Sequence, residues 1–245
     1  MTGEKRRGFD PDDSRFFSNA ELAKLYTAQE DIQWLLDRGY KTGSVTEFTG
    51  NHYQLASRQR TALQRSTSAK LQYESRKKRE LPLEAAKEGC IYIDGFNLII
   101  TLEVALSGSL VILGKDGVLR DLAGLRGTYS LIGHTDEAIL LIGDCLKQLS
   151  VPKAVLYLDS PVSNSGRLRN RIMEYSSGWD MPIEVELVPN ADVILSKLER
   201  VVTGDSIILD QCTSWFNLSR KIIGDYIKTA WILNLNNEKE KGLPL

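Results

Sequence analysis

Residues 90–100 read Cys-Ile-Tyr-Ile-Asp-Gly-Phe-Asn-Leu-Ile-Ile, and this stretch decides the fold. A short apolar, β-branched run predicts a buried strand, with Asp94 and Asn97 where the chain emerges from it. In a parallel α/β sheet, ligands bind beyond the carboxyl ends of the strands, and Gly95 lets the backbone bend away there. Asp94 is therefore the first candidate for a functional carboxylate.

Three later apolar runs also end near an acid. They are residues 154–159 ending at Asp159, residues 183–188 with Asp192 just beyond, and residues 207–210 ending at Asp210. If these runs are neighbouring parallel strands, their carboxylates converge on one edge of the sheet.

The pattern around these runs predicts two domains. Helices are expected at about 19–38, from Ser44 to Gly50 and over 53–79, which makes residues 1–83 a small all-α domain with a linker at 76–83. In residues 84–245, a hairpin at 110–122 and helical patterns separate the apolar runs, and a last strand is expected at 229–233. Alternating strands and helices are typical of an α/β fold with a mostly parallel sheet covered on both faces.

Composition excludes several classes of protein. Apolar residues make up 42% and charged residues 26% of the chain, as in ordinary globular proteins. No apolar run approaches the roughly 18 residues of a membrane helix, and no signal-peptide core follows the N-terminus, so we expect a cytoplasmic protein without a membrane partner. Cys90, Cys145 and Cys212 are odd in number and show no CxxC spacing, which argues against a disulfide framework and a zinc site.

The net charge of −1 combines a basic N-terminal part with an acidic C-terminal part. Residues 1–80 carry 15 Lys and Arg against 11 Asp and Glu, whereas residues 81–245 carry 16 against 21. Between residues 51 and 79 there are eight basic side chains, including Arg58, Arg60 and Arg65, and one acid. This distribution favours a basic module that presents a polyanion to an acidic site.

A second group of anion-binding candidates follows Asp159. Residues 160–167 read Ser-Pro-Val-Ser-Asn-Ser-Gly-Arg and precede an expected helix. Hydroxyls, a glycine and an arginine before a helix N-terminus are a favourable setting for a phosphate. The candidates here are Ser163, Ser165 and Arg167.

Carboxylates gathered at a sheet edge repel one another, and a hard cation such as Mg²⁺ or Mn²⁺ relieves that repulsion. Ligands that are all oxygens, in a chain with two histidines, do not suit a typical zinc site. One or two such ions can activate water and neutralise charge on a phosphodiester. The pattern therefore favours metal-dependent phosphodiester hydrolysis.

Four features resemble the PIN/NYN-like nuclease superfamily over residues 89–235. They are Asp94-Gly95-Phe96-Asn97 after the first strand, an acid on an early helix (Asp136 or Glu137), Asp192 followed by Val193-Ile194-Leu195, and a strand reaching Asp210. The resemblance implies a parallel α/β/α sandwich that cleaves RNA, with Asp94, Asp192 and Asp210 holding Mg²⁺ or Mn²⁺. It also implies that Asn97 orients the first acid or the substrate.

The whole chain is also similar to an uncharacterised prokaryotic family in which a small helical domain precedes a PIN-like domain, a resemblance that brings no activity with it. Two assignments remain open. Asp159 and Asp136 are supporting catalytic candidates, although Asp159 is outside the superfamily pattern and Glu137 competes with Asp136. Asp205 competes with Asp210, which we prefer because it ends an apolar run.

We thus expect a ribonuclease that acts on RNA, with tRNA or another structured RNA among the candidates and a homodimer left open. One alternative is a non-catalytic RNA-binding module in which the acids serve as caps and turn residues. Another is a haloacid-dehalogenase-like phosphatase. That chemistry needs an Asp two residues after the first, where this chain has Phe96 or Pro161.

Overall fold

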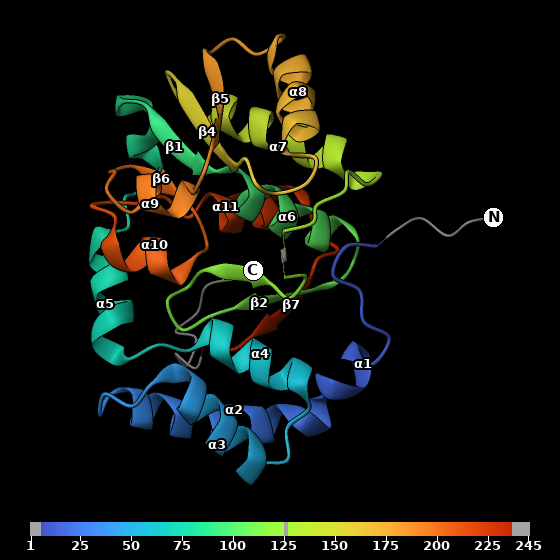
Figure 1. The fold of residues 1–245 in the computed structure, drawn as a ribbon, viewed down its shortest axis with the longest axis vertical. Helices are drawn as coiled ribbons and strands as arrows, with labels where there is room; N and C mark the ends of the chain where they lie inside the picture. Colours follow the sequence, from blue (N-terminus) through green and yellow to red (C-terminus); the bar gives the residue numbers. More distant parts are fainter. Residues whose placement is uncertain (1–5, 125–126, 237–245) are drawn as a thin grey trace, which may run out of the picture.

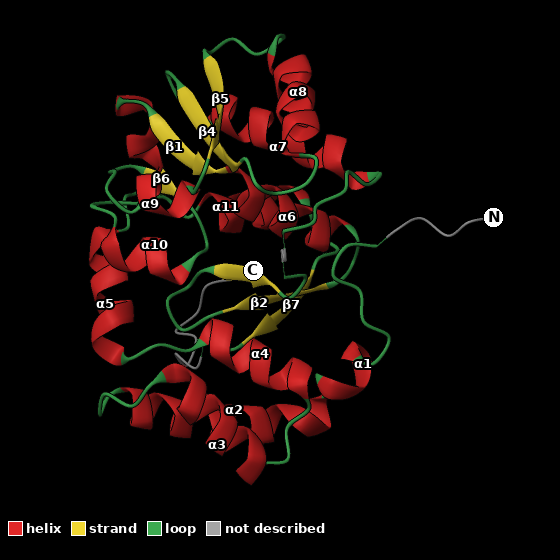
Figure 2. Cartoon of the chain, in the orientation of Figure 1, coloured by secondary structure: helices red, strands yellow, loops and turns green. Residues whose placement is uncertain are grey.

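The computed structural model describes residues 6–124 and 127–236 (Figures 1 and 2). Its main sheet has four parallel strands in the order β5-β4-β1-β6. These strands are β1 (Ile91–Asp94), β4 (Ala154–Asp159), β5 (Ile183–Val188) and β6 (Val201–Val202). The predicted parallel sheet is confirmed, and so are the strands expected at 91–94, 154–159 and 183–188.

Helices cover both faces of this sheet. Helices α7 (His134–Gln148) and α8 (Ser165–Ser176) share the largest hydrophobic core with one face. Helices α9 (Ala191–Leu195) and α10 (Ser206–Gln211) share a smaller core with the other face, while α11 (Leu218–Tyr226) packs against α6 and α7. The predicted fold class, α/β with flanking helices and a helical N-terminal region, is confirmed.

The fourth parallel strand is not the one that the sequence predicted. Residues 207–210 form α10 instead of a strand, because the Asp205 carboxylate accepts hydrogen bonds from the backbone N–H groups of Ile207 (2.7 Å) and Ile208 (3.3 Å) and so starts a helix. The place beside β1 is taken by β6, in which Val202 pairs with Ile93. The acid that follows the fourth strand is therefore Asp205.

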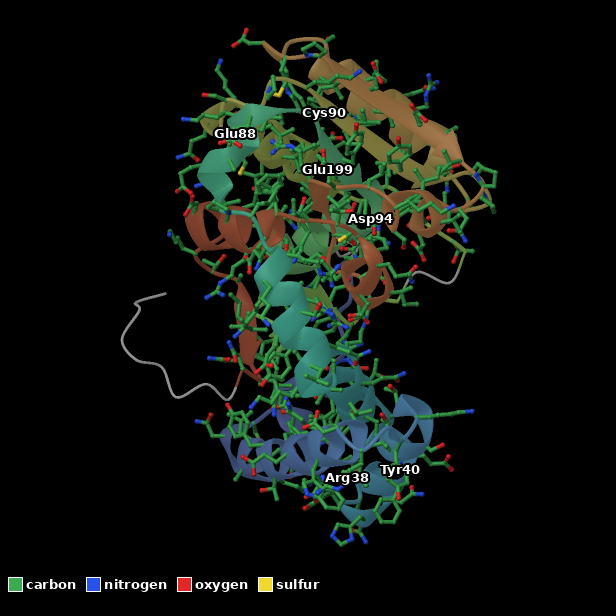
Figure 3. All side chains as sticks on the ribbon, turned by 90° about the vertical axis from the view of Figure 1, so that its left-hand side faces the viewer. Arg38, Tyr40, Glu88, Cys90, Asp94 and Glu199 are labelled. Atoms are coloured by element: carbon green, nitrogen blue, oxygen red, sulfur yellow. The ribbon has the colours of Figure 1, made fainter. Side chains whose placement is uncertain are left out.

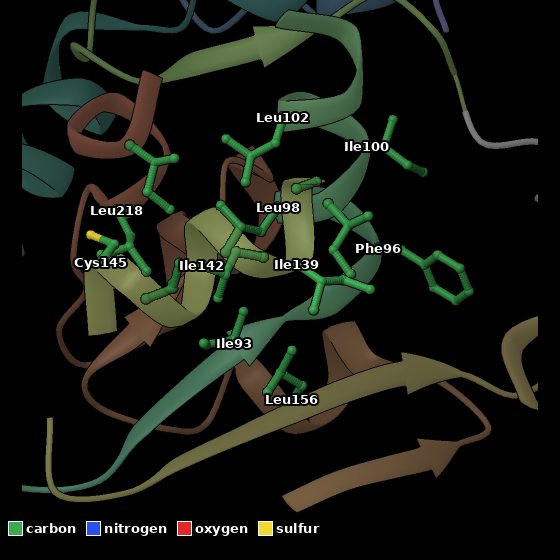
Figure 4. Close-up of a cluster of buried hydrophobic side chains, with 14 of the residues drawn as sticks. Ile93, Phe96, Leu98, Ile100, Leu102, Ile139, Ile142, Cys145, Leu156 and Leu218 are labelled. Carbon is green, nitrogen blue, oxygen red and sulfur yellow. The ribbon is translucent and has the colours of Figure 1, made fainter. Parts of the chain in front are cut away.

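Helix α6 (Gly95–Leu106) begins directly after β1, so the strand ends at Asp94 and the apolar residues Leu98, Ile99 and Ile100 are helical. The Asp94 carboxylate caps this helix by accepting a hydrogen bond from Asn97 N. Nearly every residue of α6 is buried, and Figure 4 shows Leu98 beside Ile139 and Ile142 of α7. A run that is apolar on all sides has no periodicity to distinguish helix from strand.

A second sheet, in the order β3-β2-β7, lies between the parallel sheet and the N-terminal helices (Figure 1). The predicted hairpin is confirmed: β2 (Leu110–Leu113) and β3 (Leu119–Asp121) are antiparallel, and β7 (Trp231–Asn234) joins β2 in parallel.

The N-terminal region contains α1 (Asp13–Phe16), α2 (Asn19–Leu36), α3 (Thr42–His52), α4 (Ser57–Ser66) and α5 (Lys70–Arg79), followed by a 3₁₀ helix at Leu83–Glu88. The single helix predicted over 53–79 is wrong. Gln54 has a positive φ after α3, and Thr67 is extended between α4 and α5. The helices bury Leu25 and Leu63 against Leu110 and Leu233 of the second sheet, so one core crosses the boundary expected at residue 83.

Within the described residues, no helix is both long and apolar enough to span a lipid bilayer.

Candidate active site at the edge of the parallel sheet

Asp94 ends β1 and is 7% exposed. Figure 3 labels Cys90 and Asp94 near the two ends of this strand, with Asp94 at the end toward the middle of the molecule. Its two oxygens accept hydrogen bonds from Thr203 Oγ1 (2.8 Å) and Asn97 N (3.3 Å). Burial raises the pKa of Asp94 to about 7, and the charges of Asp192 and Asp205 add to that effect against the two hydrogen bonds. This carboxyl group therefore changes its charge near neutral pH.

Asp192 lies in the first turn of α9, which follows β5, and is half-buried. Asn190 caps this helix by accepting a hydrogen bond from Val193 N at 3.1 Å, so capping does not need Asp192. Burial raises the pKa of Asp192, and Asp205 and Asp159 raise it further. In the described part of the chain, no hydrogen bond or ion pair reaches its carboxylate, which leaves it free to meet a ligand.

Asp205 is the third member of the group, which we call the acid rim (Asp94, Asp192 and Asp205). Besides capping α10, it donates its backbone N–H to Thr203 Oγ1 at 3.0 Å. Because that same hydroxyl donates to Asp94, Thr203 links the two acids. The pKa shifts of Asp94 and Asp192 show that each of these two acids lies within electrostatic reach of Asp205.

The loop that carries Asp205 is held from two sides. Gly204 N donates to Asn97 Oδ1 at 2.7 Å, and Arg120 Nε donates to Gly204 O at 2.8 Å. A Cβ atom on Gly204 would lie 3.1 Å from Asn97 Oδ1 and 3.1 Å from Leu119 O, so the close approach suits glycine. Asn97 belongs to the site, as predicted from its place after the strand, but its side chain positions this loop.

Asp159 ends β4, and its Oδ1 accepts a hydrogen bond from Ala191 N at 2.8 Å. It thereby holds the start of α9 and lies close enough to Asp192 to raise that residue's pKa. Asp159 is thus a neighbour of the acid rim with a structural hydrogen bond of its own.

The expected placement of Asp210 at the sheet edge is wrong. Asp210 lies near the end of α10 and forms a two-pronged ion pair with Arg76, with distances of 2.6 Å from Nε to Oδ1 and 2.9 Å from Nη2 to Oδ2. Because residues 207–210 are helical, this side chain is directed to α5 instead of the carboxyl end of β1. The alternative acid, Asp205, occupies the edge.

Asp136 lies in the first turn of α7, and its partner is Arg171 of α8, with Nε–Oδ1 and Nη2–Oδ2 distances of 2.6 and 2.5 Å. This hydrogen-bonded pair is the largest cause of its lowered pKa. Its competitor Glu137 is exposed and contacts His134 Nδ1 at 3.2 Å. The structure thus pairs Asp136 with an arginine and does not join either acid to the acid rim.

The loop after β4 leads into α8, as a phosphate-binding loop would. The hydroxyl groups of its two candidate serines, however, form hydrogen bonds within the protein. Ser163 Oγ accepts from Tyr129 N at 3.0 Å and donates to Tyr129 O at 3.2 Å, and Ser165 Oγ donates to Ser160 O at 3.3 Å. Arg167 is exposed and lines a hollow of about 480 Å³ beside Asp136.

The basic residues predicted to bind RNA form ion pairs and hydrogen bonds within the protein. Arg58 pairs with Asp13 at 2.8 Å and donates to Gly8 O and Leu122 O. Arg60 donates to Leu55 O and Asn51 Oδ1. Arg65 donates to the backbone and side chain of Asp121 and keeps a 34% exposed side chain. Their first role is therefore to fasten α4 to the rest of the fold.

A cleft of about 930 Å³ opens between α4 and the segment Gly204–Ile207. One wall is the exposed face of α4, the other is Gly204–Ile207, and Arg120 and residues 122–124 also line it. Asp205 belongs to both the cleft and the acid rim, whereas Asp94 and Asp192 do not line the cleft.

The acid rim has the donor chemistry of a hard-cation site. In the ranges that the structure describes, no three His, Cys, Asp or Glu residues are close enough to hold a metal ion among them. Magnesium, however, is usually held by one or two carboxylates, with water and substrate phosphates completing the shell. Asp94 and Asp192, whose pKa values are raised by burial and by neighbouring acids, fit a cation bound in that way.

Comparison with known families places most of these residues in one unit. Residues 83–221 match the model named "Domain of unknown function (DUF5616)", and residues 24–79 match "Protein of unknown function (DUF434)". The chain belongs to the DUF5616 family. It is similar to the uncharacterized protein MJ0935 of Methanocaldococcus jannaschii, with 37% identity over 182 residues, which cover 74% of this chain and 87% of that relative. No solved structure matches the chain.

The acid rim lies within the DUF5616 match, and α4 lies within the DUF434 match. The two matches meet near the linker expected at 76–83. The cleft therefore has one wall from each matched region.

Proposed function

We propose that this protein is a metal-dependent nuclease that hydrolyses phosphodiester bonds in RNA, with the acid rim as its catalytic centre. The observation that carries the proposal is the state of Asp94: a buried carboxyl group with a pKa of about 7, beside two further acids. Among the described residues, no lysine or arginine forms an ion pair with any of the three acids. Such an excess of negative charge favours an external cation.

The chain's own residues prepare the site for this chemistry. Thr203 Oγ1 and Asn97 N fix the two oxygens of Asp94, so the carboxylate meets a ligand in one orientation. Binding of a cation would favour the ionised form of this carboxylate over the protonated form that burial favours. The two hydrogen bonds that hold Gly204, to Asn97 Oδ1 and from Arg120 Nε, keep Asp205 close to Asp94. A Mg²⁺ or Mn²⁺ ion held by Asp94 and Asp192 would lower the pKa of bound water and neutralise charge on the phosphodiester.

Similarity in motif supports the same reaction class. The Asp-Gly-x-Asn sequence after a parallel strand and the acid after β5 are the features that resemble PIN/NYN-like nucleases, and both lie at the acid rim. A fold hosts many activities, so the argument rests on the acids themselves.

The test is cleavage of a panel of single-stranded and structured RNAs, tRNA included, at pH 8 with Mg²⁺ or Mn²⁺. We expect the wild type to cleave RNA and Asp94→Asn to cleave it at least about a hundredfold more slowly. Asparagine keeps one acceptor oxygen for the helix cap and removes the charge, together with the hydrogen bond that Thr203 Oγ1 donates to the second oxygen. The matched control is Asp180→Asn, which changes a 75% exposed carboxylate paired with Lys147.

Equal cutting by wild type and Asp94→Asn would refute this site. A specific observation supports one alternative: Asp159 and Asp205 already accept backbone hydrogen bonds, as structural acids do. If both proteins bind RNA and neither cuts it with either metal, a non-catalytic RNA-binding protein is the better description.

A further inference from the structure

One face of α4 is polar and exposed toward the cleft. Ser57, Thr61, Gln64 and Arg65 are spaced i, i+4, i+7 and i+8, which places them on one side of the helix. All four line the cleft, and the first three are exposed. The opposite side of α4 buries Ala62 and Leu63 in the core of the N-terminal helices. The cleft therefore has a row of hydroxyl, amide and guanidinium groups along one wall, of which the Thr61 hydroxyl already donates to Ser57 O at 3.0 Å.

Arg65 has donors to spare in this row. Its Nη1 binds Asp121, whereas no described residue accepts a hydrogen bond from its Nε or Nη2. Arg58, by comparison, uses Nε, Nη1 and Nη2 on Asp13 and two carbonyls. Arg65 is thus the arginine on this wall that can still bind a ligand's anionic oxygen.

The opposite wall presents an acid and an apolar side chain. Asp205 connects this wall to the acid rim, and Ile207 is 60% exposed at the start of α10. Both walls are held in place by buried groups: Arg58 ties α4 to Asp13, and Arg120 ties Gly204 to Asp116 through hydrogen bonds of 2.6 to 2.9 Å. The cleft is formed before any ligand enters it.

We propose that this cleft binds a single strand of nucleic acid, with its sugar-phosphate backbone along Ser57, Thr61, Gln64 and Arg65, and leads one phosphodiester past Asp205 to the acid rim. The proposal rests on the proposed nuclease function and adds a role for the N-terminal helices. Hydroxyl, amide and guanidinium groups are the side chains that contact phosphate and sugar oxygens. At about 930 Å³, the cleft lies at the upper end of the range for small-molecule pockets, which leaves room for an extended strand.

The test uses a pair of matched threonines. Thr61 on α4 and Thr27 on α2 are both exposed, and each donates its hydroxyl to the carbonyl four residues earlier, at 3.0 and 3.1 Å. Thr61 lines the cleft and Thr27 does not. Replacing each with Glu adds the same charge to a helix surface, inside the cleft in one variant and outside it in the other. Circular dichroism establishes that both variants are folded.

Binding is measured by fluorescence anisotropy of a fluorescein-labelled ten-nucleotide oligouridylate in EDTA, so that no metal-dependent cleavage occurs. We expect Thr61→Glu to raise Kd by about tenfold, because a carboxylate in the cleft repels the phosphates. Thr27→Glu is expected to stay within about twofold of the wild type, because its charge lies outside the cleft.

Equal Kd values for the two variants would overturn the proposal, as would a wild type that binds neither the oligouridylate nor a DNA strand of the same length. The result is separate from that of the cleavage test. Asp94-dependent cutting with equal Kd values would keep the nuclease and reject the cleft. Loss of binding in Thr61→Glu without any cutting by the wild type would keep the cleft and reject the nuclease.

Discussion

Two sets of carboxylates, each with one buried member and half-buried neighbours, differ in their counter-charges. The acid rim has no arginine or lysine partner among the described residues, and the pKa of Asp94 is raised to about 7. The second set, Asp116 and Asp210, is paired with Arg76 and Arg120. Burial opposes ionisation of Asp116, but the two arginines outweigh it and lower its pKa to about 2.

The difference separates acids whose charge the fold neutralises from acids whose charge it leaves without a basic partner among the described residues. Where arginines inside the fold balance the negative charge, the carboxylates join α5, the β2–β3 turn and α10 into one network. Where no such balance exists, the charge is available to a cation from solution. The two sets are connected, because Arg120 also donates to Gly204 O and so positions the loop of the acid rim.

The largest effect is expected from Arg76→Met, which leaves Asp116 and Asp210 without their shared partner. Removing one partner from a buried ion pair costs about 3–5 kcal/mol, because the remaining charge stays buried. Urea unfolding at pH 7 measures this loss. The control is Lys78→Met, an exposed position on the same helix. A loss below about 1 kcal/mol in Arg76→Met would show that the network does not hold the fold together.

Asp94→Asn should have the next largest effect on the free energy of unfolding, and the size of this effect should depend on pH. In the metal-free wild type, the folded-state pKa of about 7 lies above the ordinary value of 3.8. Stability from the retained proton is therefore complete below pH 3.8 and is lost as pH rises through 7. Because asparagine is neutral throughout, we expect the variant's free energy of unfolding, relative to wild type, to rise by about 4 kcal/mol between pH 4 and pH 8.

Urea unfolding in EDTA at both pH values checks this prediction, with Asp180→Asn as the exposed control. A difference between variant and wild type that does not change with pH would show that Asp94 ionises normally and would weaken the comparison of the two sets.

Divalent cations should produce a smaller effect at the acid rim. At pH 8 and a Mg²⁺ concentration ten times Kd, a single site stabilises the folded wild type by about 1.4 kcal/mol. We expect this gain to be absent in Asp94→Asn and in Asp192→Asn. Thermal unfolding with and without Mg²⁺ measures it, and an equal gain in all three proteins would indicate non-specific binding elsewhere.

The smallest effect concerns the coupling between the acids. The charge of Asp192 raises the pKa of Asp94, so Asp192→Asn should lower the pKa of Asp94 by a fraction of a unit. Carbon-13 NMR titration of the Asp94 carboxyl group measures this shift. Asp136→Asn serves as the control because its carboxylate is paired with Arg171. Equal titration curves in the two variants would show that Asp192 does not act on Asp94.

Several parts of the site could be predicted from sequence because the signal is local. A short apolar run that ends in Asp-Gly predicts β1 and the position of Asp94, and the same logic identified β4 with Asp159 and β5 with Asp192. Asn97 lies just after β1, and its predicted role of orienting Asp94 or the substrate stays a prediction. Its side chain accepts a hydrogen bond from Gly204, 107 residues away in the chain. Asp205 was considered and not preferred, and Thr203 and Arg120 gave no signal.

The sequence by itself thus determined which apolar segments are buried and where acids follow them. Only the tertiary structure decided between helix and strand for two segments. Residues 95–106 form an apolar run buried on nearly all sides, which has no periodicity, and residues 207–210 are too few to show one. The tertiary structure also decided which acids are neutralised, since Arg76 meets Asp210 across 134 residues of chain. The position of an aspartate in the sequence does not show which basic residue, if any, neutralises its charge. Its counter-charge depends on which distant arginines packing brings within hydrogen-bonding distance, and this determines whether the aspartate serves the fold or remains available for chemistry.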